Sequence, residues 1–114
     1  MKMIKNITPV FISSNLDVTE KFWIEVLSFK TDGKHDDYLI MNNGNIEVHF
    51  SKLPSVNKKT NNCACYLGVD NLDDLYKKCL EFNCVHPNGK LEKLPWGREF
   101  AIVDPDCNLI KIAE

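Results

Sequence analysis

The closing stretch of the chain, LPWGREFAIVDPDCNLIKIAE (residues 94–114), carries the most specific fold signal in the sequence. Two runs rich in Phe, Ile, Val and Leu flank the polar segment DPDCN (residues 104–108). Apolar runs on either side of a short polar turn are typical of an antiparallel β-hairpin. We therefore expect the chain to end in a hairpin, with Trp96-Gly97 at the mouth of its first strand.

The first half of the chain predicts a strand, a helix and then further strands. Residues 3–13 are rich in Ile, Val and Phe, as strands are, and residues 14–17 offer helix-capping side chains. In residues 18–27 the apolar side chains recur at helical spacing. Residues 37–50 form two apolar runs around Asn43-Gly44, a strong two-residue hairpin signal. The predicted order is β-α-β-β-β.

The second half repeats this order. Residues 63–69 predict a strand, and residues 72–82 predict a helix with Leu72, Leu75, Tyr76, Cys79 and Leu80 on one side. A short edge segment and the closing hairpin follow. The triplet Asn-Leu-Asp at residues 15–17 recurs at residues 71–73, and residues 53–62 between the halves are polar. The repeat predicts two similar modules joined by a loop.

Composition and charge limit the class of protein. The chain has 114 residues, of which 44% are hydrophobic and 26% charged, enough for one domain with a core. A formal net charge of −2 gives no overall attraction for nucleic acid or anionic membrane. No apolar run reaches the length of a membrane span, and residues 1–6 lack the pattern of a signal peptide. We expect a soluble, cytoplasmic protein.

The five cysteines also favour a reducing compartment. Their number is odd, and no two have the C-x2-C spacing of a zinc knuckle. We expect reduced, mostly buried thiols, and we give little weight to a zinc site built from Cys63, Cys65 and a distant histidine.

Four stretches of the chain together resemble the glyoxalase / bleomycin resistance / extradiol dioxygenase superfamily, the vicinal oxygen chelate proteins, and in particular its bleomycin resistance proteins. These stretches are PVFISSNLDVTEKFWIEVLSF, DYLIMNNGNIEVHFSKLP, CYLGVDNLDDLYKKC and PWGREFAIVDPDCNLIKI. The resemblance implies an α+β fold of two βαβββ modules whose eight strands form an incompletely closed barrel. We place module 1 at about 1–54, the linker at 55–61 and module 2 at about 62–114 of a single domain, 1–114. The resemblance also implies a homodimer with ligand clefts at its interface.

The superfamily's enzymes hold a divalent metal with four side chains, and the resemblance places those positions at Thr8, Glu47, Ala64 and Lys111. Alanine has no donor atom, and a lysine ammonium adds positive charge beside a cation. A catalytic metal usually has three protein ligands, and Glu47 is the one suitable ligand here, even with His49 on the same strand face. The sequence therefore predicts no metal and no cofactor.

The polar residues expected on the curved sheet face that holds ligands in this superfamily have three interpretations. Glu47 and Lys111 are expected at related places of the two modules, where they orient a ligand, form an ion pair, or are simply solvated on an open sheet face. His49 is a candidate ligand contact. It is a weak candidate general base, because no orienting carboxylate stands at a defined spacing.

Two aromatic residues are candidate ligand surfaces. Trp96 lies outside any periodic apolar run, which favours stacking on a flat ligand or packing on a partner subunit over a core position. Tyr38 matches an aromatic residue of the bleomycin resistance proteins. Arg98 is expected either to bind a ligand anion or to pair with Glu99.

The chain departs from the bleomycin resistance pattern in two ways. Cys107 replaces the glycine usual at the end of the turn, so the backbone there is either reachable by a residue with a Cβ or strained. The resistance proteins hold their cationic glycopeptide in strongly acidic clefts. Basic residues expected near the cleft here, which are Lys58, Lys59, Arg98 and Lys111, argue against that cargo.

Two functions remain open from the sequence. The first is a non-catalytic protein that binds or sequesters a planar, partly aromatic small molecule of the antibiotic type. The alternative is an enzyme of the same superfamily, either a metal-dependent lyase or dioxygenase or a metal-independent isomerase. The loss of the ligand set with retention of the aromatic residues favours the first.

Overall fold

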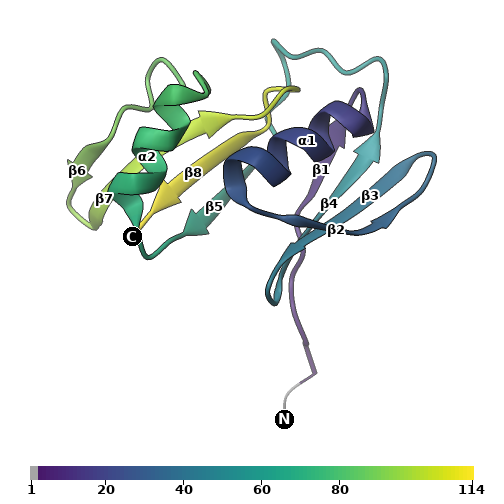
Figure 1. Cartoon of the computed structure of the whole chain (residues 1–114), viewed down its shortest axis with the longest axis horizontal. Helices are drawn as coiled ribbons and strands as arrows, with labels where there is room; N and C mark the ends of the chain where they lie inside the picture. Colours follow the sequence, from purple (N-terminus) through teal and green to yellow (C-terminus); the bar gives the residue numbers. More distant parts are fainter. Residues whose placement is uncertain (1–2) are drawn as a thin grey trace.

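The computed structural model describes residues 3–114, and Figure 1 shows the arrangement of its elements. The first half contains β1 (Val10–Ser13), α1 (Leu16–Leu27), β2 (Lys30–Lys34), β3 (Tyr38–Asn43) and β4 (Ile46–Lys52). The second half contains β5 (Ala64–Gly68), α2 (Leu72–Glu81), β6 (Glu92–Leu94), β7 (Gly97–Val103) and β8 (Leu109–Ala113). The chain therefore repeats the order β-α-β-β-β, as its sequence predicts.

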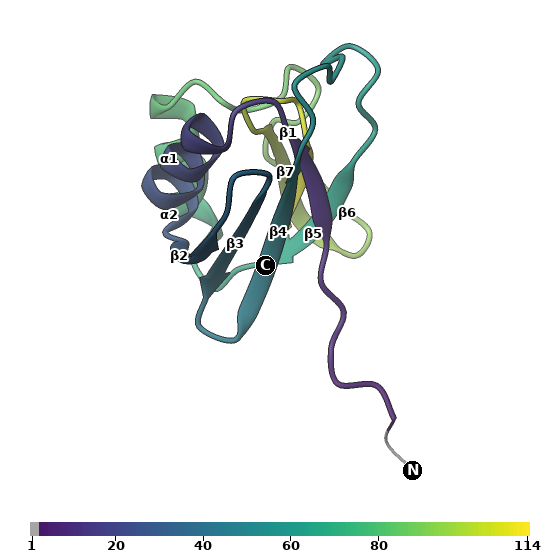
Figure 2. The same ribbon diagram turned by 90° about the vertical axis from the view of Figure 1, so that its right-hand side faces the viewer.

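Each half forms its own four-stranded sheet. The strand orders are β1-β4-β3-β2 and β5-β8-β7-β6, with the first pair of each sheet parallel and the other pairs antiparallel. The two sheets are not closed into a barrel. Figure 2 shows α1 and α2 on the same side of the molecule, so the opposite faces of the sheets are left without a helix. The predicted α+β fold of two βαβββ modules is confirmed.

The helices begin at the repeated triplet. Asn15 is the N-cap of α1, and its side-chain oxygen accepts hydrogen bonds from the backbone N–H groups of Asp17 (3.0 Å) and Val18 (3.2 Å). Asn71 is the N-cap of α2 but makes no such bond, and its amide donates to Asp74 instead. The triplet thus marks both helix starts, although only the first is capped in the usual way. Within residues 3–114, no helix combines the length and the apolar character needed to cross a bilayer.

Three local predictions are corrected. The first strand begins at Val10, and not at residue 3, because Pro9 has no N–H for the ladder and the described part of the chain offers residues 3–8 no strand partner. The β3–β4 loop is Gly44-Asn45, one residue beyond the predicted pair, since Asn43 pairs with Ile46. Leu80 is exposed, although its spacing predicts a place on the buried side of α2.

The core lies between the sheets and the helices, and both modules contribute to it. Strand alternation buries the odd residues of β3 and the even residues of β4, β7 and β8. The largest fully buried side chains include Trp23, Phe11, Phe50 and Phe100. Because alternate residues fill this core, their neighbours along each strand are directed to the open face.

The turn between β7 and β8 joins the two modules. The carboxylate of Asp104 accepts four hydrogen bonds: Oδ1 from the backbone N–H groups of Asp106 (3.0 Å) and Asn108 (2.9 Å), and Oδ2 from Trp23 Nε1 (3.2 Å) and Asn108 Nδ2 (2.8 Å). Asn108 also donates to the carbonyl of Ile12, at 2.9 Å. Burial raises the pKa of Asp104 and the four donors oppose that rise. The polar residues of the turn are therefore a buried connection between the modules.

Cys107 has the backbone conformation expected for a glycine. Its φ is 64°, in the left-handed region, and its N–H donates to the carbonyl of Asp104 at 2.9 Å. A residue with a Cβ reaches this region at a cost of roughly 1–2 kcal/mol. The turn thus keeps the geometry of the glycine-containing pattern, and Cys107 carries the strain.

Candidate functional site

The open faces of the two sheets carry the candidate ligand-binding residues. On the first sheet, Glu47 and His49 of β4 alternate with the buried Val48 and Phe50. On the second sheet, Tyr66 of β5 and Glu99 of β7 alternate with inward residues in the same way. The period of two in the strands therefore places an acidic and an aromatic set on exposed surfaces.

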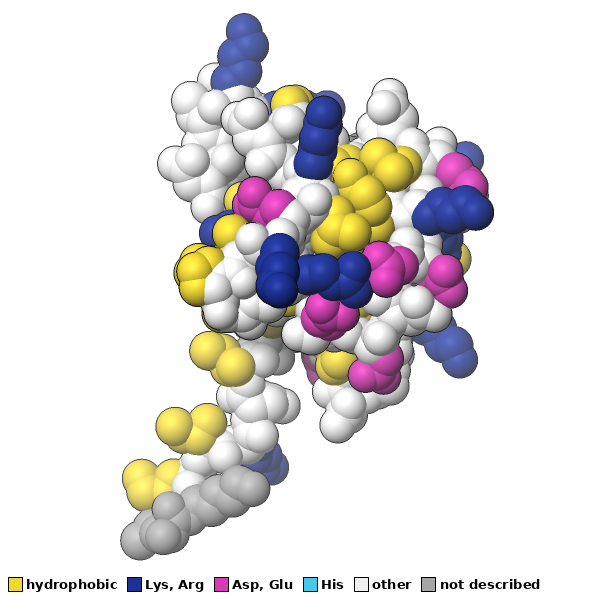
Figure 3. Space-filling model, turned by 90° about the vertical axis from the view of Figure 1, so that its left-hand side faces the viewer, with side chains coloured by type: hydrophobic (Ala, Val, Ile, Leu, Met, Phe, Trp, Pro, Cys, Tyr) yellow, Lys and Arg dark blue, Asp and Glu magenta, His cyan; other side chains and the backbone are white. Residues whose placement is uncertain are grey.

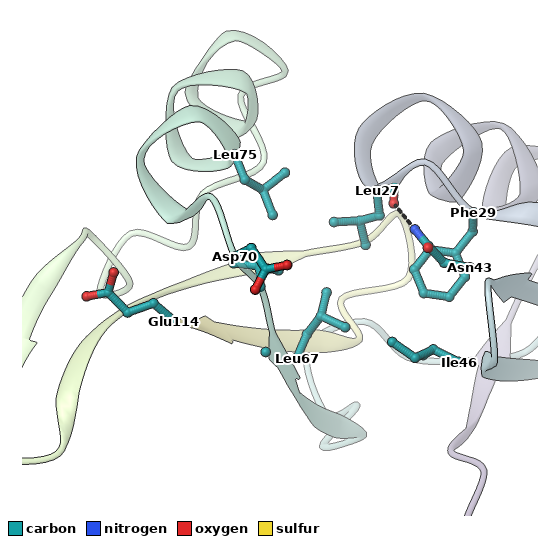
Figure 4. A pocket seen from close by; sticks show the side chains of 10 residues that line it. Leu27, Phe29, Asn43, Ile46, Leu67, Asp70, Leu75 and Glu114 are labelled. Carbon is teal, nitrogen blue, oxygen red and sulfur yellow. Dashed lines mark hydrogen bonds between the residues drawn. The ribbon is translucent and has the colours of Figure 1, made fainter.

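A cavity of about 610 Å³ lies where the two sheets meet. Its walls come from residues 6–9, from α1 and Phe29, from the start of β4 and from β5, and both Glu47 and Tyr66 line it. A second hollow of about 540 Å³ adjoins it on the helix side and shares Phe29, Ile46 and Leu67 with it. Figure 4 shows that second hollow, with Leu67 and Ile46 at its floor and Leu27 and Leu75 coming from the two helices. The seam between the modules is thus hollow and largely apolar.

Three of the predicted site residues form one hydrogen-bonded array on the first sheet. The hydroxyl of Tyr38 lies 2.7 Å from His49 Nδ1, and the other ring nitrogen, Nε2, is hydrogen-bonded to Glu47 Oε1. An ionised Glu47 accepts from Nε2–H, which leaves Nδ1 of a neutral ring to accept from Tyr38. The structure therefore supplies the orienting carboxylate that the sequence did not reveal, two residues from the histidine on the same strand.

The second sheet carries a matching aromatic cluster centred on Glu99. Trp96 Nε1 donates to Glu99 Oε1 at 2.8 Å, and the hydroxyl of Tyr66 donates to the same oxygen at 2.6 Å. Both rings remain accessible, because Trp96 is 71% exposed and Tyr66 is 56% exposed. The hydrogen bonds from Tyr66 and Trp96 lower the pKa of Glu99, so the carboxylate is charged at neutral pH.

Gly97 shapes the position of Trp96. Pro95 and Trp96 form the two-residue loop between Leu94 and Gly97, which pair across the β6–β7 hairpin. Gly97 has a φ of 131°, a conformation that side-chain-bearing residues avoid. The Trp-Gly dipeptide therefore belongs to a tight loop that projects the indole from the sheet.

Sequence reasoning missed Glu99 and Tyr66 as site residues. A signal for both was present, because the apolar alternation of Phe100 and Ile102 directs Glu99 outwards, and that of Cys65 and Leu67 does the same for Tyr66. What the alternation could not show is that side chains from two strands and a loop meet at one carboxylate oxygen.

The register of the strands corrects the predicted relation of Glu47 and Lys111. Val10 lies opposite His49 in the first sheet, and Tyr66, which is 56 residues after Val10, lies opposite Lys111 in the second. The two repeated triplets are also 56 residues apart, so Lys111 corresponds to His49, and not to Glu47. Lys111 is exposed, and its charge acts on Glu99.

Arg98 is not brought to the open face. It alternates with Glu99 along β7 and lies on the side of α2, where its guanidinium contacts Asp73 (3.0 and 3.2 Å) and Glu114 (2.8 and 3.0 Å). These are also its ion pairs, so the predicted pairing with Glu99 is wrong. The guanidinium of Arg98 thus has its hydrogen-bond donors taken up by two bidentate carboxylates, on the sheet face opposite to Glu99.

The charge at the open faces also differs from the sequence prediction. Arg98 is neutralised on the other side of β7, and Lys58 and Lys59 line a separate cavity of about 440 Å³ with His86 and Cys107. Of the four basic residues expected near the cleft, only Lys111 shares a face with Glu99. The argument against a cationic ligand therefore loses most of its support.

The four residues that the resemblance matches to the superfamily's metal positions do not fit a divalent metal. Thr8 and Glu47 reach the 610 Å³ cavity, but Ala64 offers no donor and the Lys111 ammonium repels a cation. In the part of the chain that the structure describes, no group of three or more His, Cys, Asp or Glu side chains could hold a metal. This donor set does not support a metal-dependent step.

Comparison with known proteins adds the family. A family model described as a glyoxalase-like domain matches residues 6–114. Bleomycin resistance proteins of Geobacillus stearothermophilus and Staphylococcus aureus are 40% identical to the chain over 48 residues, a match that covers 41% of this chain. It covers 36% of those relatives, so the chain spans about a third of the length of the curated proteins that it matches.

Solved structures share the whole fold. A bleomycin resistance determinant encoded on the transposon Tn5 superposes with a TM-score of 0.84 at 24% identity, over 97% of this chain and 98% of that one. A bleomycin-binding protein of Streptomyces verticillus, complexed with copper(II)-bleomycin, gives a TM-score of 0.81 at 21% identity, over 99% of this chain and 98% of that one. At these identities the likeness shows the fold.

Proposed function

This chain belongs to the glyoxalase-like domain family, and we propose that it is a non-catalytic member that binds and sequesters a planar, partly aromatic antibiotic of the bleomycin kind. The observation that carries the proposal is the open cluster of Trp96, Tyr66 and Glu99. Two accessible rings beside a carboxylate suit a flat ligand that carries positive charge or hydrogen-bond donors. Similarity to bleomycin resistance proteins in sequence and in fold supports the choice of ligand.

The cavity between the sheets lies within reach of both polar sets. Glu47 lines it from the first sheet and is hydrogen-bonded to His49, which is hydrogen-bonded to Tyr38. Tyr66 lines it from the second sheet and is hydrogen-bonded to Glu99, which also accepts from Trp96. A ligand with an apolar portion in the cavity would therefore have polar contacts and stacking surfaces on both sides. Lys111 is kept as a further proposed contact on the second sheet.

A second candidate function rests on the Tyr38–His49–Glu47 array. A histidine held between a hydroxyl and a carboxylate is an arrangement that general bases use. This observation favours a metal-independent proton transfer over a metal-dependent lyase. Chemical change of the bound molecule separates the two candidates, since sequestration leaves the ligand intact.

Titration of the tryptophan fluorescence with bleomycin tests the proposed function. Trp96 is 71% exposed, whereas Trp23 is 1% exposed and borders the 610 Å³ cavity, so the titration is run on the wild type and on Trp96→Phe, and the difference between them reports the emission of Trp96. We expect saturable quenching by metal-free bleomycin. An unchanged emission at saturating ligand, together with no heat of binding in calorimetry, would contradict the proposal.

We further propose that the chain forms a homodimer through its N-terminal segment. Residues 3–9 have no regular secondary structure; residues 6–9 border the 610 Å³ cavity, and the segment before them extends away from the body, as Figure 2 shows. Figure 3 shows hydrophobic side chains along this extension, and Met3, Ile4 and Ile7 are 78–94% exposed. Burying such surface against a second copy is favourable by about 25 cal/mol per Å². A second copy is the occupant that the family resemblance implies.

Light scattering checks the dimer. At micromolar concentration the wild-type chain is expected to have twice the 13.1 kDa mass of one chain. The double substitution Ile4→Asp and Ile7→Asp places charge on the segment that the proposed dimer buries, and it is expected to give a folded monomer. The matched control is Val18→Asp with Ile24→Asp, two exposed apolar residues of α1 outside the segment, which should leave the mass unchanged. A wild-type mass of one chain would contradict the proposal.

The cysteines support our proposal of a reducing, cytoplasmic location. All five are free; Cys79 and Cys84 are buried, and the other three are half-buried. Burial raises the pKa of Cys65 to about 11, so its thiol stays protonated and unreactive. The fold therefore forms with all five cysteines as thiols.

A further inference from the structure

We propose that Glu99 is the positioning residue of the aromatic surface: its carboxylate holds Trp96 and Tyr66 in place for stacking, and its charge selects planar cations over neutral planar molecules. This inference rests on the proposed function for the ligand class, but the positioning itself can be observed without any ligand. It also makes Tyr66 a ligand-contact residue.

The first argument is the geometry of the two hydrogen bonds. Trp96 Nε1 and the Tyr66 hydroxyl donate to the same oxygen, Glu99 Oε1, at 2.8 and 2.6 Å. Trp96 comes from the loop before β7 and Tyr66 from the edge strand β5, two strands away from Glu99. One atom therefore ties together side chains from opposite parts of the sheet.

The second argument is that the exposed rings have little else to hold them. At 71% and 56% exposure, Trp96 and Tyr66 have few core contacts, and their rotation is opposed by these hydrogen bonds. Ordering a mobile side chain at an interface costs binding free energy. Because Glu99 already orders both rings in the free protein, ligand binding does not have to order them.

The third argument concerns the second oxygen. Glu99 Oε2 makes no hydrogen bond among the described residues, and the pKa of the carboxyl is lowered, so it presents a free acceptor and a charge beside the rings. Lys111 is the nearby cation, and its charge contributes to that lowering. A flat molecule with positive charge at its edge can stack on the rings and meet Oε2 at the same time.

The experiment uses two substitutions that separate position from charge. Glu99→Gln keeps an amide oxygen that can accept both hydrogen bonds at the place of Oε1, but removes the charge. Glu99→Ala removes both. The probes are acridine, which is neutral in mildly alkaline buffer, and N-methylacridinium, which has the same rings and a permanent positive charge.

The ligand-free readout is the fluorescence anisotropy of Trp96, isolated by iodide quenching because Trp23 is buried. We expect Glu99→Ala to lower the anisotropy and Glu99→Gln to leave it near that of the wild type. Equal anisotropy in all three proteins would overturn the positioning role, whether or not any ligand binds. Unchanged melting temperatures, expected for a half-buried carboxylate on the open face, show that both variants are folded.

The binding readout is the affinity for the two probes. Glu99→Ala is expected to weaken acridine about tenfold, because both rings must then be ordered on binding, while Glu99→Gln leaves acridine unchanged. For N-methylacridinium, Glu99→Gln is expected to weaken binding about two- to fivefold. Equal effects of Glu99→Gln on both probes would overturn the charge selection. Failure of the wild type to bind bleomycin, with the anisotropy result intact, would instead count against the proposed function.

Discussion

Replacing Asp104 by asparagine is expected to lower the free energy of unfolding by about 3–5 kcal/mol, the largest stability effect that we anticipate for a change of so few atoms. Each oxygen of Asp104 accepts two hydrogen bonds, so an amide nitrogen in either place faces two donors and no acceptor. Two bonds are lost in either case: those from the backbone N–H groups of Asp106 and Asn108 if the nitrogen replaces Oδ1, or those from the side chains of Trp23 and Asn108 if it replaces Oδ2. Thermal unfolding should show a fall in melting temperature of about 10–20 °C.

The matched control is Asp106→Asn, the same change two residues away in an equally buried position. Asp106 Oδ2 accepts a single hydrogen bond, from the backbone N–H of Ser14 at 3.1 Å, and Oδ1 has no partner among the described residues. An asparagine can keep the bond to Ser14, so we expect a cost of about 1 kcal/mol or less. If both variants lose the same stability, the turn does not join the modules through Asp104.

Replacing Trp96 by alanine is expected to weaken the binding of bleomycin about ten- to a hundredfold. The basis is that stacking and burial of one aromatic ring contribute roughly 1–3 kcal/mol. The melting temperature should change little, because the indole is exposed and its one hydrogen bond, to Glu99, lies at the surface. Isothermal titration calorimetry measures the affinity and differential scanning calorimetry the stability.

Trp96→Phe is the control for this prediction. It keeps a ring for stacking but removes the Nε1–H that donates to Glu99, so we expect an intermediate loss of affinity. A large loss of stability in Trp96→Ala, without any change in affinity, would instead identify Trp96 as a packing residue of the subunit or of a dimer.

Strand and helix order could be predicted from the sequence because the signals are local. The Asn-Leu-Asp triplets mark both helix starts, and apolar alternation marks the strands of both closing hairpins. The predicted start of the first strand was wrong because strand pairing, and not composition, decides where a strand begins. Residues 3–9 have strand-like composition but no described partner strand. The predicted burial of Leu80 was wrong because helical spacing alone does not show which part of α2 the sheet covers.

The candidate site could be predicted only in part. Tyr38, Glu47 and His49 were expected separately, but their hydrogen-bonded array depends on the pairing of β3 with β4. The register between β5 and β8 and that between β1 and β4 decide that Lys111 corresponds to His49, and no local pattern shows this. Arg98 and Glu99 are neighbours in sequence, yet the pleat of β7 sends them to opposite faces.

Recovery of the ligand after binding tests the central claim most directly. The protein is saturated with metal-free bleomycin, separated from unbound ligand, denatured, and the released molecule is identified by mass spectrometry. Sequestration on an aromatic surface predicts stoichiometric recovery of bleomycin with unchanged mass, from the wild type and from His49→Ala alike. Recovery of an altered molecule from the wild type, and of unchanged bleomycin from His49→Ala, would contradict sequestration and identify the Tyr38–His49–Glu47 array as catalytic.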